Sequence, residues 1–293
     1  LERLGRPRPP RRGRLVGVTA RPEAQFEEAV EASPVPDLAR AGLVRTLEAH
    51  PEASDRLAAD PGLVRALLAV TSASRSLTRH VEADIAALDV LAELDAPVGI
   101  SAESPERLVA TKRLEYLRIA ARDLIRVDAL EATGASLAAL GRDVLAASCI
   151  LAEAEHLAVI GMGKLGGDEL NYASDIDVMF VGEAEHAAMV KAARNVLDHA
   201  RRCFRVDANL RPEGRDGPLA RTVSSYEAYW DKWAQPWEFQ ALLKARPVAG
   251  DAALGAAYHA AATARLWSRH FSADDLRSVR AMKERAESES AKK

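Results

Sequence analysis

The chain has 293 residues, a formal net charge of −3 and 48% hydrophobic residues, which predicts roughly two domains with a sizeable core. Such a weak charge predicts no nucleic-acid partner, and no apolar run approaches the ~18 residues that would predict a membrane span. Cys149 and Cys203 fit no zinc spacing and are typical of thiols in a reducing cytosol, so we expect a cytoplasmic protein.

The N-terminal segment is basic and rich in proline. Residues 1–14 contain six arginines and three prolines, so we predict that residues 1–35 form a disordered arm. A solvated tail explains this composition, and contact with nucleic acid is the alternative. The chain begins at Leu1 and ends at Lys293 in a polar run, so we expect a fragment of a longer protein.

Residues 36–155 are rich in Ala, Leu, Arg and Glu, with apolar residues three and four positions apart, which is typical of helices. The breaks in this pattern are at His50-Pro51, Asp60-Pro61 and Ala96-Pro97. Ser104 predicts an N-cap, with Pro105 at the first helical position. We therefore predict a helical region that packs against the segment after it.

The most informative stretch is residues 156–182, HLAVIGMGKLGGDELNYASDIDVMFVG. It opens with an apolar run that predicts a buried strand, and a glycine-rich turn follows. Side chains alternate along a strand, so Asp175 and Asp177 should share one face while Ile176 and Val178 face a core. Two neighbouring carboxylates repel each other, and a divalent cation is the usual reason to place them together. Mg²⁺ favours such oxygen ligands, so the sequence predicts a magnesium site.

The same turn contains a literal Gly161-x-Gly163-x-x-Gly166 match to the dinucleotide-binding fingerprint. That fingerprint needs a crossover helix, a second strand and an acidic residue about 20 positions on. The residues between the turn and Asp175 leave no room for such a helix, so we reject this fold. A Walker A loop is excluded because no Gly-Lys-Ser/Thr closes the turn.

A glycine pair followed by Asp-x-Asp in a strand resembles the signature of polymerase-β-like nucleotidyltransferases. Mg²⁺ held by the aspartates bridges phosphates and the attacking and leaving oxygens in such enzymes. Residues 185–203 predict a helix and residues 204–210 a strand that carries Asp207. We expect Asp207 to complete the carboxylate set as a third metal ligand or as a catalytic base beside Asp175 and Asp177.

The remaining residues complete the predicted fold. Residues 226–243 predict a helix broken near Gln235-Pro236, and residues 244–251 predict an edge strand. The fold class we predict is therefore α+β. A helical region, residues 36–155, precedes a nucleotidyltransferase domain with a mixed sheet, residues 156–251. Residues 252–293 are the truncated start of a helical bundle.

Several residues are candidate ligands for nucleotide or phosphate. They are Gly166 and Gly167, whose backbone N–H groups could approach phosphates, and Lys164, Ser174, Arg211, Lys244 and Arg246. Alternatives remain open for three of them. Lys164 could be a surface lysine, Ser174 could cap the start of the strand, and Arg211 could form a salt bridge with Glu213 or Asp216.

Three segments resemble the glutamine synthetase adenylyltransferase family. They are GMGKLGGDELNYASDIDVMFV, VDANLRPEGRDGPL and WEFQALLKARPVAGD, in the family's order, and the resemblance covers the chain from about Leu43. It implies a Mg²⁺-dependent enzyme that uses ATP, ADP and phosphate, with glutamine synthetase and the PII signalling protein as partners. Members of that family carry two heads. The C-terminal head adenylylates a tyrosine of glutamine synthetase with ATP, and the N-terminal head removes the AMP by phosphorolysis and releases ADP.

The long helical region and Asn171-Tyr172 before Asp175 resemble the N-terminal, adenylyl-removing head. The resemblance therefore implies control of nitrogen assimilation through deadenylylation of glutamine synthetase. ATP-dependent transfer to the same tyrosine is one alternative. A docking or regulatory fragment without catalysis is the other.

Overall fold

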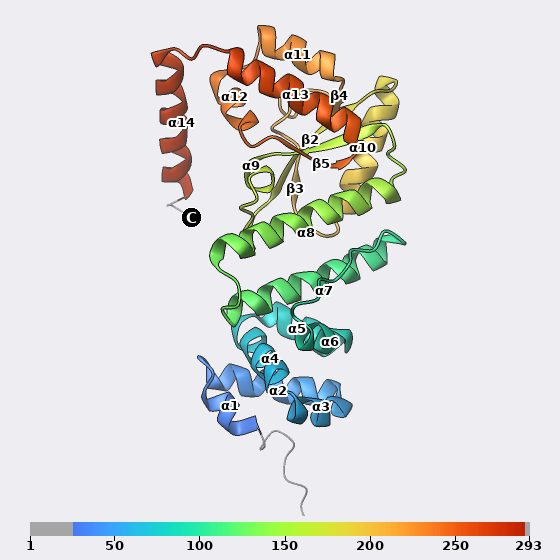
Figure 1. The fold of residues 1–293 in the computed structure, drawn as a ribbon, viewed down its shortest axis with the longest axis vertical. Helices are drawn as coiled ribbons and strands as arrows, with labels where there is room; N and C mark the ends of the chain where they lie inside the picture. Colours follow the sequence, from blue (N-terminus) through green and yellow to red (C-terminus); the bar gives the residue numbers. More distant parts are fainter. Residues whose placement is uncertain (1–25, 291–293) are drawn as a thin grey trace, which may run out of the picture.

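The computed structural model describes residues 26–290, with helices at one end of an elongated shape and a sheet at the other (Figure 1). Residues 1–25 of the predicted arm lie outside the described residues. Glu27–Glu31 form helix α1, so the prediction of disorder is wrong for this part of the arm. Phe26 and Val30 explain the helix, because they lie one turn apart and are buried among the helices that follow.

Helices fill the described chain from α1 to the first strand, as predicted. They are α2 (Pro36–Ala49), α3 (Ser54–Ala59), α4 (Pro61–Ala73), α5 (Arg75–Ala83), α6 (Ala86–Ala92), α7 (Pro105–Leu124) and α8 (Leu130–Leu151), with a 3-10 turn at Pro51–Ala53. Ser104 accepts a hydrogen bond from the backbone N–H of Arg107 at 3.2 Å, which confirms the predicted N-cap. Asp60 caps α4 in the same way, through the N–H of Leu63 at 3.0 Å.

A mixed sheet follows, again as predicted. Its strands in the described residues are β1 (Leu157–Gly161), β2 (Ile176–Gly182), β3 (Val206–Asp207), β4 (Ala220–Arg221) and β5 (Arg246–Gly250). The order is β3-β2-β1-β5, and β4 also pairs with β2. Strand β1 runs antiparallel to β2 and β5, whereas β3 and β4 run parallel to β2. The antiparallel β1–β2 pair excludes the dinucleotide fold, whose consecutive strands are parallel.

Strand β3 is much shorter than the predicted strand over residues 204–210, because only Val206 and Asp207 pair with β2. One carboxylate oxygen of Asp207 accepts a hydrogen bond from the backbone N–H of Asn209 at 2.8 Å. Such a side-chain bond to the backbone two residues on is typical of a turn. The chain therefore leaves the sheet directly after Asp207, which places this carboxylate at the sheet edge.

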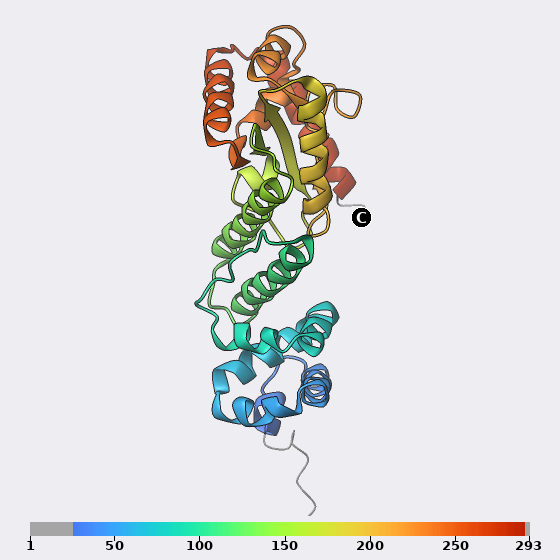
Figure 2. The same ribbon diagram turned by 90° about the vertical axis from the view of Figure 1, so that its right-hand side faces the viewer.

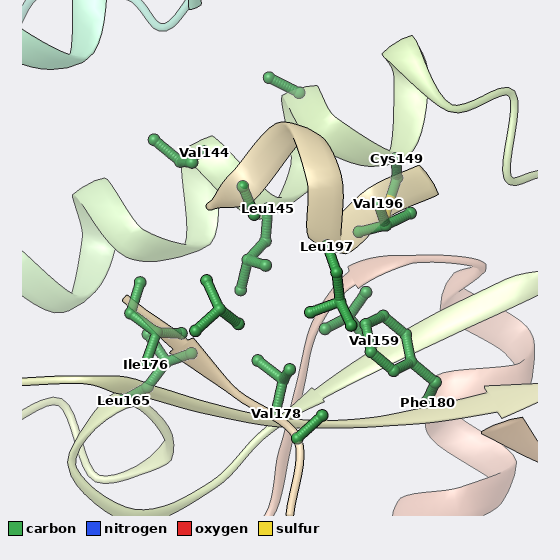
Figure 3. Packing of buried hydrophobic residues seen from close by; sticks show 14 of the residues in the cluster. Val144, Leu145, Cys149, Val159, Leu165, Ile176, Val178, Phe180, Val196 and Leu197 are labelled. Atoms are coloured by element: carbon green, nitrogen blue, oxygen red, sulfur yellow. The ribbon is translucent and has the colours of Figure 1, made fainter. Parts of the chain in front are cut away.

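Helices cover both faces of the sheet. The helices after β1 in the described residues are α9 (Gly163–Gly166), α10 (His186–Ala200), α11 (Val223–Lys232), α12 (Pro236–Leu242), α13 (Ala252–Ser268) and α14 (Ala273–Ser290). Helices α8 and α10 share one core with the sheet, in which Leu145 and Leu197 approach Val178 and Phe180 (Figure 3). Helices α11, α12 and α13 pack against the opposite face, and α14 lies beside α12.

Helix α8 corrects one prediction from the sequence. Its 22 residues have a mean hydropathy of 1.4 in their most apolar window, which is long and apolar enough to cross a membrane by length and composition. Half of that window is buried inside the protein, where α8 packs on α7, α10 and β5. A buried core helix meets the same criteria, and this packing explains the apolar sequence.

Candidate functional site

The two aspartates of the Asp-x-Asp segment lie at the start of β2. Ile176 and Val178 are fully buried in the core shared with α8 and α10, whereas Asp175 is exposed and Asp177 is half-buried. The predicted alternation of faces is therefore confirmed. Asp177 is the register partner of Asp207 on the parallel strand β3. Residues opposite each other on adjacent strands present their side chains to the same face, so three carboxylates gather at this edge of the sheet.

Asp177 is the most perturbed carboxyl group of the three. Burial and the negative charges of Asp207 and Asp175 raise its pKa to about 6, and the ammonium group of Lys164 partly opposes this rise. Burial and like charges both disfavour a carboxylate. The site therefore has an excess of negative charge, which a cation would relieve.

Gly163 brings the turn after β1 against this carboxylate. Its φ of +53° lies in the left-handed region, and a Cβ atom there would lie 2.7 Å from Oδ2 of Asp177. The backbone N–H of Met162 also donates to the main-chain oxygen of Asp177 at 2.9 Å. Only glycine allows both the backbone conformation and this close approach without strain.

Gly166 and Gly167 were predicted to offer backbone N–H groups to phosphates, but in the structure they have another role. Their backbone N–H groups donate to the carbonyl oxygens of Met162 and Gly163, at 3.0 and 3.1 Å, and are therefore engaged within the turn. A Cβ atom on Gly166 would lie 1.8 Å from the carbonyl oxygen of Lys244. The absence of a side chain at Gly166 thus allows the chain entering β5 to pass close to the turn.

Lys164 and Ser174 lie together beside the carboxylates. The ammonium of Lys164 is exposed and donates to Ser174 at 3.4 Å. The hydroxyl of Ser174 also donates to the side chain of Asn171 at 2.8 Å and accepts from its backbone N–H at 3.2 Å. Ser174 therefore closes the loop before β2, while Lys164 keeps donor capacity for a phosphate.

Two further predicted phosphate ligands lie near the start of the edge strand β5: Arg246 is its first residue and Lys244 lies two residues before it. Lys244 forms an ion pair with Glu169, and Arg246 forms one with Asp168. Arg142 on α8 pairs with the same Asp168. In this structure, therefore, these cations connect β5 and α8 to the loop after α9.

Arg211 forms its hydrogen bonds within its own loop. Its guanidinium donates to the carbonyl oxygens of Ala208, Arg215 and Gly217 at 2.7, 3.0 and 3.0 Å. The expected alternative, a salt bridge with Glu213 or Asp216, is not among its contacts, and Glu213 pairs with Arg221 instead. Arg211 therefore holds the loop between β3 and β4 in shape.

Helix α7 contacts both loops that carry the carboxylates. Tyr172 donates a hydrogen bond to Asp123 on α7 at 2.8 Å, and its ring packs edge-on against Tyr116 at 5.6 Å. Lys112 lies 4.3 Å above the ring of Tyr116 and 4.5 Å above the ring of Phe204, just before β3. The helical region thus positions the start of β2 and the start of β3 together.

The donor set of the site suits a hard divalent cation, since it consists of carboxylate oxygens. Among the described residues, however, no three acidic, histidine or cysteine side chains are grouped closely enough to hold a metal ion. The predicted three-ligand group is therefore not assembled in this structure. Asp175 explains the difference, because its carboxylate is paired with Arg205 at 2.5 Å.

Two residues of this site were missed by the sequence reasoning. Gly163 was only part of a rejected fingerprint, although its position directly after a strand is where a close backbone approach is expected. Arg205 gave no motif, since its role depends on β3 pairing with β2. The guanidinium of Arg205 also donates to the carbonyl oxygen of Ala173 at 2.7 Å, so it fixes the backbone just before Asp175.

The antiparallel β1–β2 pair with its glycine turn, and the aspartates beside β3, define a polymerase-β-like nucleotidyltransferase fold. Residues 41–261 match the family described as glutamate-ammonia ligase adenylyltransferase, and the chain belongs to this family. A relative from Streptomyces coelicolor, named bifunctional glutamine synthetase adenylyltransferase/adenylyl-removing enzyme, is 43% identical over 282 residues.

That alignment covers 82% of the chain and 28% of the relative. A relative of the same name from Mycobacterium marinum is 37% identical over 291 residues, covering 93% of the chain and 28% of the relative. One from Mycobacterium tuberculosis is 47% identical over 158 residues, which is 54% of the chain and 16% of the relative. The chain thus spans just over a quarter of the length of the relatives it matches most fully.

Proposed function

We propose that this chain removes AMP from an adenylylated tyrosine of glutamine synthetase by Mg²⁺-dependent phosphorolysis, which yields tyrosine and ADP and regulates nitrogen assimilation. The observation that carries the proposal is the pairing of Asp177 with Asp207 next to Gly163. Nothing in the packing of the fold requires two carboxylates at this position. The names of the relatives support glutamine synthetase as the protein acted upon.

Asp177 and Asp207 would hold Mg²⁺, and Asp175 would join them on leaving Arg205. The bound ion supplies positive charge for the phosphate oxygens. Lys164 supplies a further positive charge from the turn. Asp207 already accepts one backbone hydrogen bond, which fixes its orientation for this task.

Phosphorolysis makes modest demands on proton transfer. The nucleophile is inorganic phosphate, already an anion at neutral pH, and the leaving group is a tyrosinate whose conjugate acid has a pKa of about 10. The site's main tasks are to hold phosphate in line and to neutralise charge on the transferred group. The opposite reaction, transfer from ATP, requires removal of the tyrosine proton, and Asp207 is a candidate base for this step.

The direction of the reaction rests on the resemblance of the segment with Asn171 and Tyr172 to the adenylyl-removing head. Control by the PII protein and by glutamine belongs to the same proposal, as does a cytoplasmic location. The free thiols of Cys149 and Cys203 fit a reducing compartment.

Two incubations test the proposal. In the first, the chain is mixed with adenylylated glutamine synthetase, Mg²⁺ and phosphate, and ADP is measured. In the second, it is mixed with unmodified synthetase, Mg²⁺ and ATP, and pyrophosphate is measured. We expect ADP in the first only. Pyrophosphate in the second would indicate the transferring head, and neither product would indicate a docking or regulatory fragment.

A further inference from the structure

A groove with a volume of about 700 Å³ lies beside β3. One wall is helix α10, which runs along the side of the sheet (Figure 2). The other wall is the loop over residues 208–219. Asp175 and Asp207 also line it, so the groove includes part of the carboxylate site.

The groove is strongly basic, although the chain as a whole has a net charge of −3. Five arginines line it: Arg194, Arg201, Arg205, Arg211 and Arg215. Arg205 and Arg211 are occupied by Asp175 and by backbone carbonyls. The other three form no ion pair with the described residues.

These three unpaired arginines are exposed to solvent. The best hydrogen bond of Arg201 is a marginal contact of 3.5 Å with the carbonyl oxygen of Val206. Their guanidinium groups therefore keep donors and charge that no described carboxylate uses, and an anionic ligand can pair with them. Arginine also offers paired N–H donors that match carboxylates.

The shape of the groove indicates the kind of anion. The lining residues on this side run from His186 at the start of α10 to Arg201 directly after it, along one face of the helix, a length of about 22 Å at 1.5 Å per residue. An extended peptide of about seven residues has this length. A single phosphate group would fill only part of such a groove. Val190, which is partly exposed, adds an apolar contact for the aliphatic parts of a peptide.

We propose that this groove binds an extended acidic segment of the protein on which the carboxylate site acts. The inference rests on the proposed function, because it takes that protein as the carrier of the modified tyrosine. Carboxylates of the segment pair with Arg194, Arg201 and Arg215, and the segment then leads toward Asp175 and Asp207. The arginines supply affinity and orientation and take no part in bond making or breaking.

A binding experiment tests the groove without any turnover. The anisotropy of fluorescein-labelled octaglutamate is measured with the chain, without metal or nucleotide. Replacement of three arginines, R194Q/R201Q/R215Q, should weaken binding at least fivefold. The control R75Q/R79Q/R107Q removes the same charge from exposed positions on α5 and α7 and should bind like the unaltered chain. Because exposed charges are screened by salt, 0.5 M NaCl should also weaken binding.

Two outcomes of this experiment would overturn the proposal. One is equal binding by the groove variant and its control. The other is displacement of octaglutamate by inorganic phosphate much better than by NaCl at equal ionic strength, which would identify a site for free phosphate.

Activity measurements separate this inference from the proposed function. If the unaltered chain releases ADP, R194Q/R201Q/R215Q should lose activity mainly through a KM for adenylylated glutamine synthetase raised at least fivefold. An unchanged KM would refute the proposed role of the groove in binding the substrate protein, while the proposed activity would stand. If the chain releases no ADP, the proposed function fails, and the octaglutamate result still decides whether the groove binds acidic peptides.

Discussion

Tyr172 donates a hydrogen bond of 2.8 Å to Asp123 and so connects the loop before β2 to helix α7. Burial and this bond to Asp123 raise the pKa of Tyr172, so its hydroxyl remains a donor at neutral pH. The loop it holds continues into Asp175. The helical region thus acts on the carboxylate site through a specific contact.

Tyr172→Phe tests this connection, because it removes the hydrogen bond and keeps the ring against Tyr116. We expect kcat to fall about 3- to 10-fold and stability to fall by about 1 kcal/mol, the usual contribution of one hydrogen bond. Release of ADP and thermal unfolding measure the two effects. Tyr116→Phe is the matched control, since its hydroxyl makes no hydrogen bond with the described residues. Equal kcat values for Tyr172→Phe and the unaltered chain would remove any role of this contact in catalysis.

Asp177→Asn should abolish turnover while making the metal-free protein more stable. Its raised pKa of about 6 means that the folded state holds this proton more tightly than the unfolded state. The contribution of the protonated Asp177 to the stability of the fold is complete below pH 3.8. It is lost as the pH rises through about 6, where the folded protein must hold a charged carboxylate. At pH 7 the amide should therefore stabilise the fold by about 1 to 2 kcal/mol, after allowance for solvent around a half-buried group.

Urea unfolding at pH 4 and pH 7 measures this difference, with the exposed Asp198→Asn on α10 as the control. The stabilisation should appear at pH 7 and be much smaller at pH 4. Full turnover by Asp177→Asn would contradict the assignment of this side chain as a metal ligand.

Gly163→Ala should inactivate the protein with only a modest loss of stability. The left-handed backbone costs about 1 kcal/mol for alanine, and the new Cβ forces Asp177 to move. A displacement of about 1 Å at a catalytic site can reduce the rate on the order of a hundredfold. Gly99→Ala is the control, because its Cβ would meet nothing within 4 Å. Normal kcat in Gly163→Ala would show that this close approach is not needed.

Gly166→Ala should mainly reduce stability, whereas Gly163→Ala should mainly reduce activity. Its Cβ would lie 1.8 Å from the carbonyl oxygen of Lys244, and neither backbone can move freely. We expect a loss of about 3 kcal/mol or more, as for other overpacked positions, measured by urea unfolding. A stable but inactive Gly166→Ala protein would instead support the original prediction that this glycine faces phosphates.

His80 should make the helical region sensitive to acid. Burial lowers its pKa below 6.5, Asp84 opposes this shift, and Arg113 and Lys112 add to it. Its Nε2 atom is buried without a hydrogen-bond partner among the described residues. Below pH 6.5 the unfolded state therefore binds more protons at His80 than the folded state. The free energy of unfolding is consequently highest above pH 6.5 and decreases as the pH falls toward the pKa of the folded state.

His80→Gln should reduce this loss between pH 6.5 and 5, by less than about 1 kcal/mol because the ring is only partly buried. His259→Gln, at an exposed position on α13, should leave the pH dependence unchanged. Thermal unfolding at several pH values compares the two variants. An identical acid dependence in His80→Gln and the unaltered chain would exclude His80 as the source.

Local patterns predicted much of this fold. Alternation placed Ile176 and Val178 in the core and Asp177 on the opposite face, and a proline after Ser104 placed the start of α7. Spacing alone excluded the dinucleotide fold. These features depend on residues close in sequence, and the structure confirms them.

The partners of the individual arginine side chains could not be predicted in the same way. Arg211 is held by carbonyls of a loop whose path depends on where β3 ends, and Arg246 by a turn that lies next to it only after β5 joins the sheet. The sequence supplied the residue types, but their partners come from distant segments. The same reason explains why Arg205 was missed.

Helix α8 has a practical consequence for dissecting the molecule. The sequence suggested a cut point at His156, yet Val144 and Leu145 of α8, with Leu108 and Ile119 of α7, belong to the core beneath the sheet. A shortened version beginning at His156 would lose the part of this core that α7 and α8 supply, and α10 would cover that face of the sheet without them. An autonomous catalytic piece therefore has to begin before Pro105.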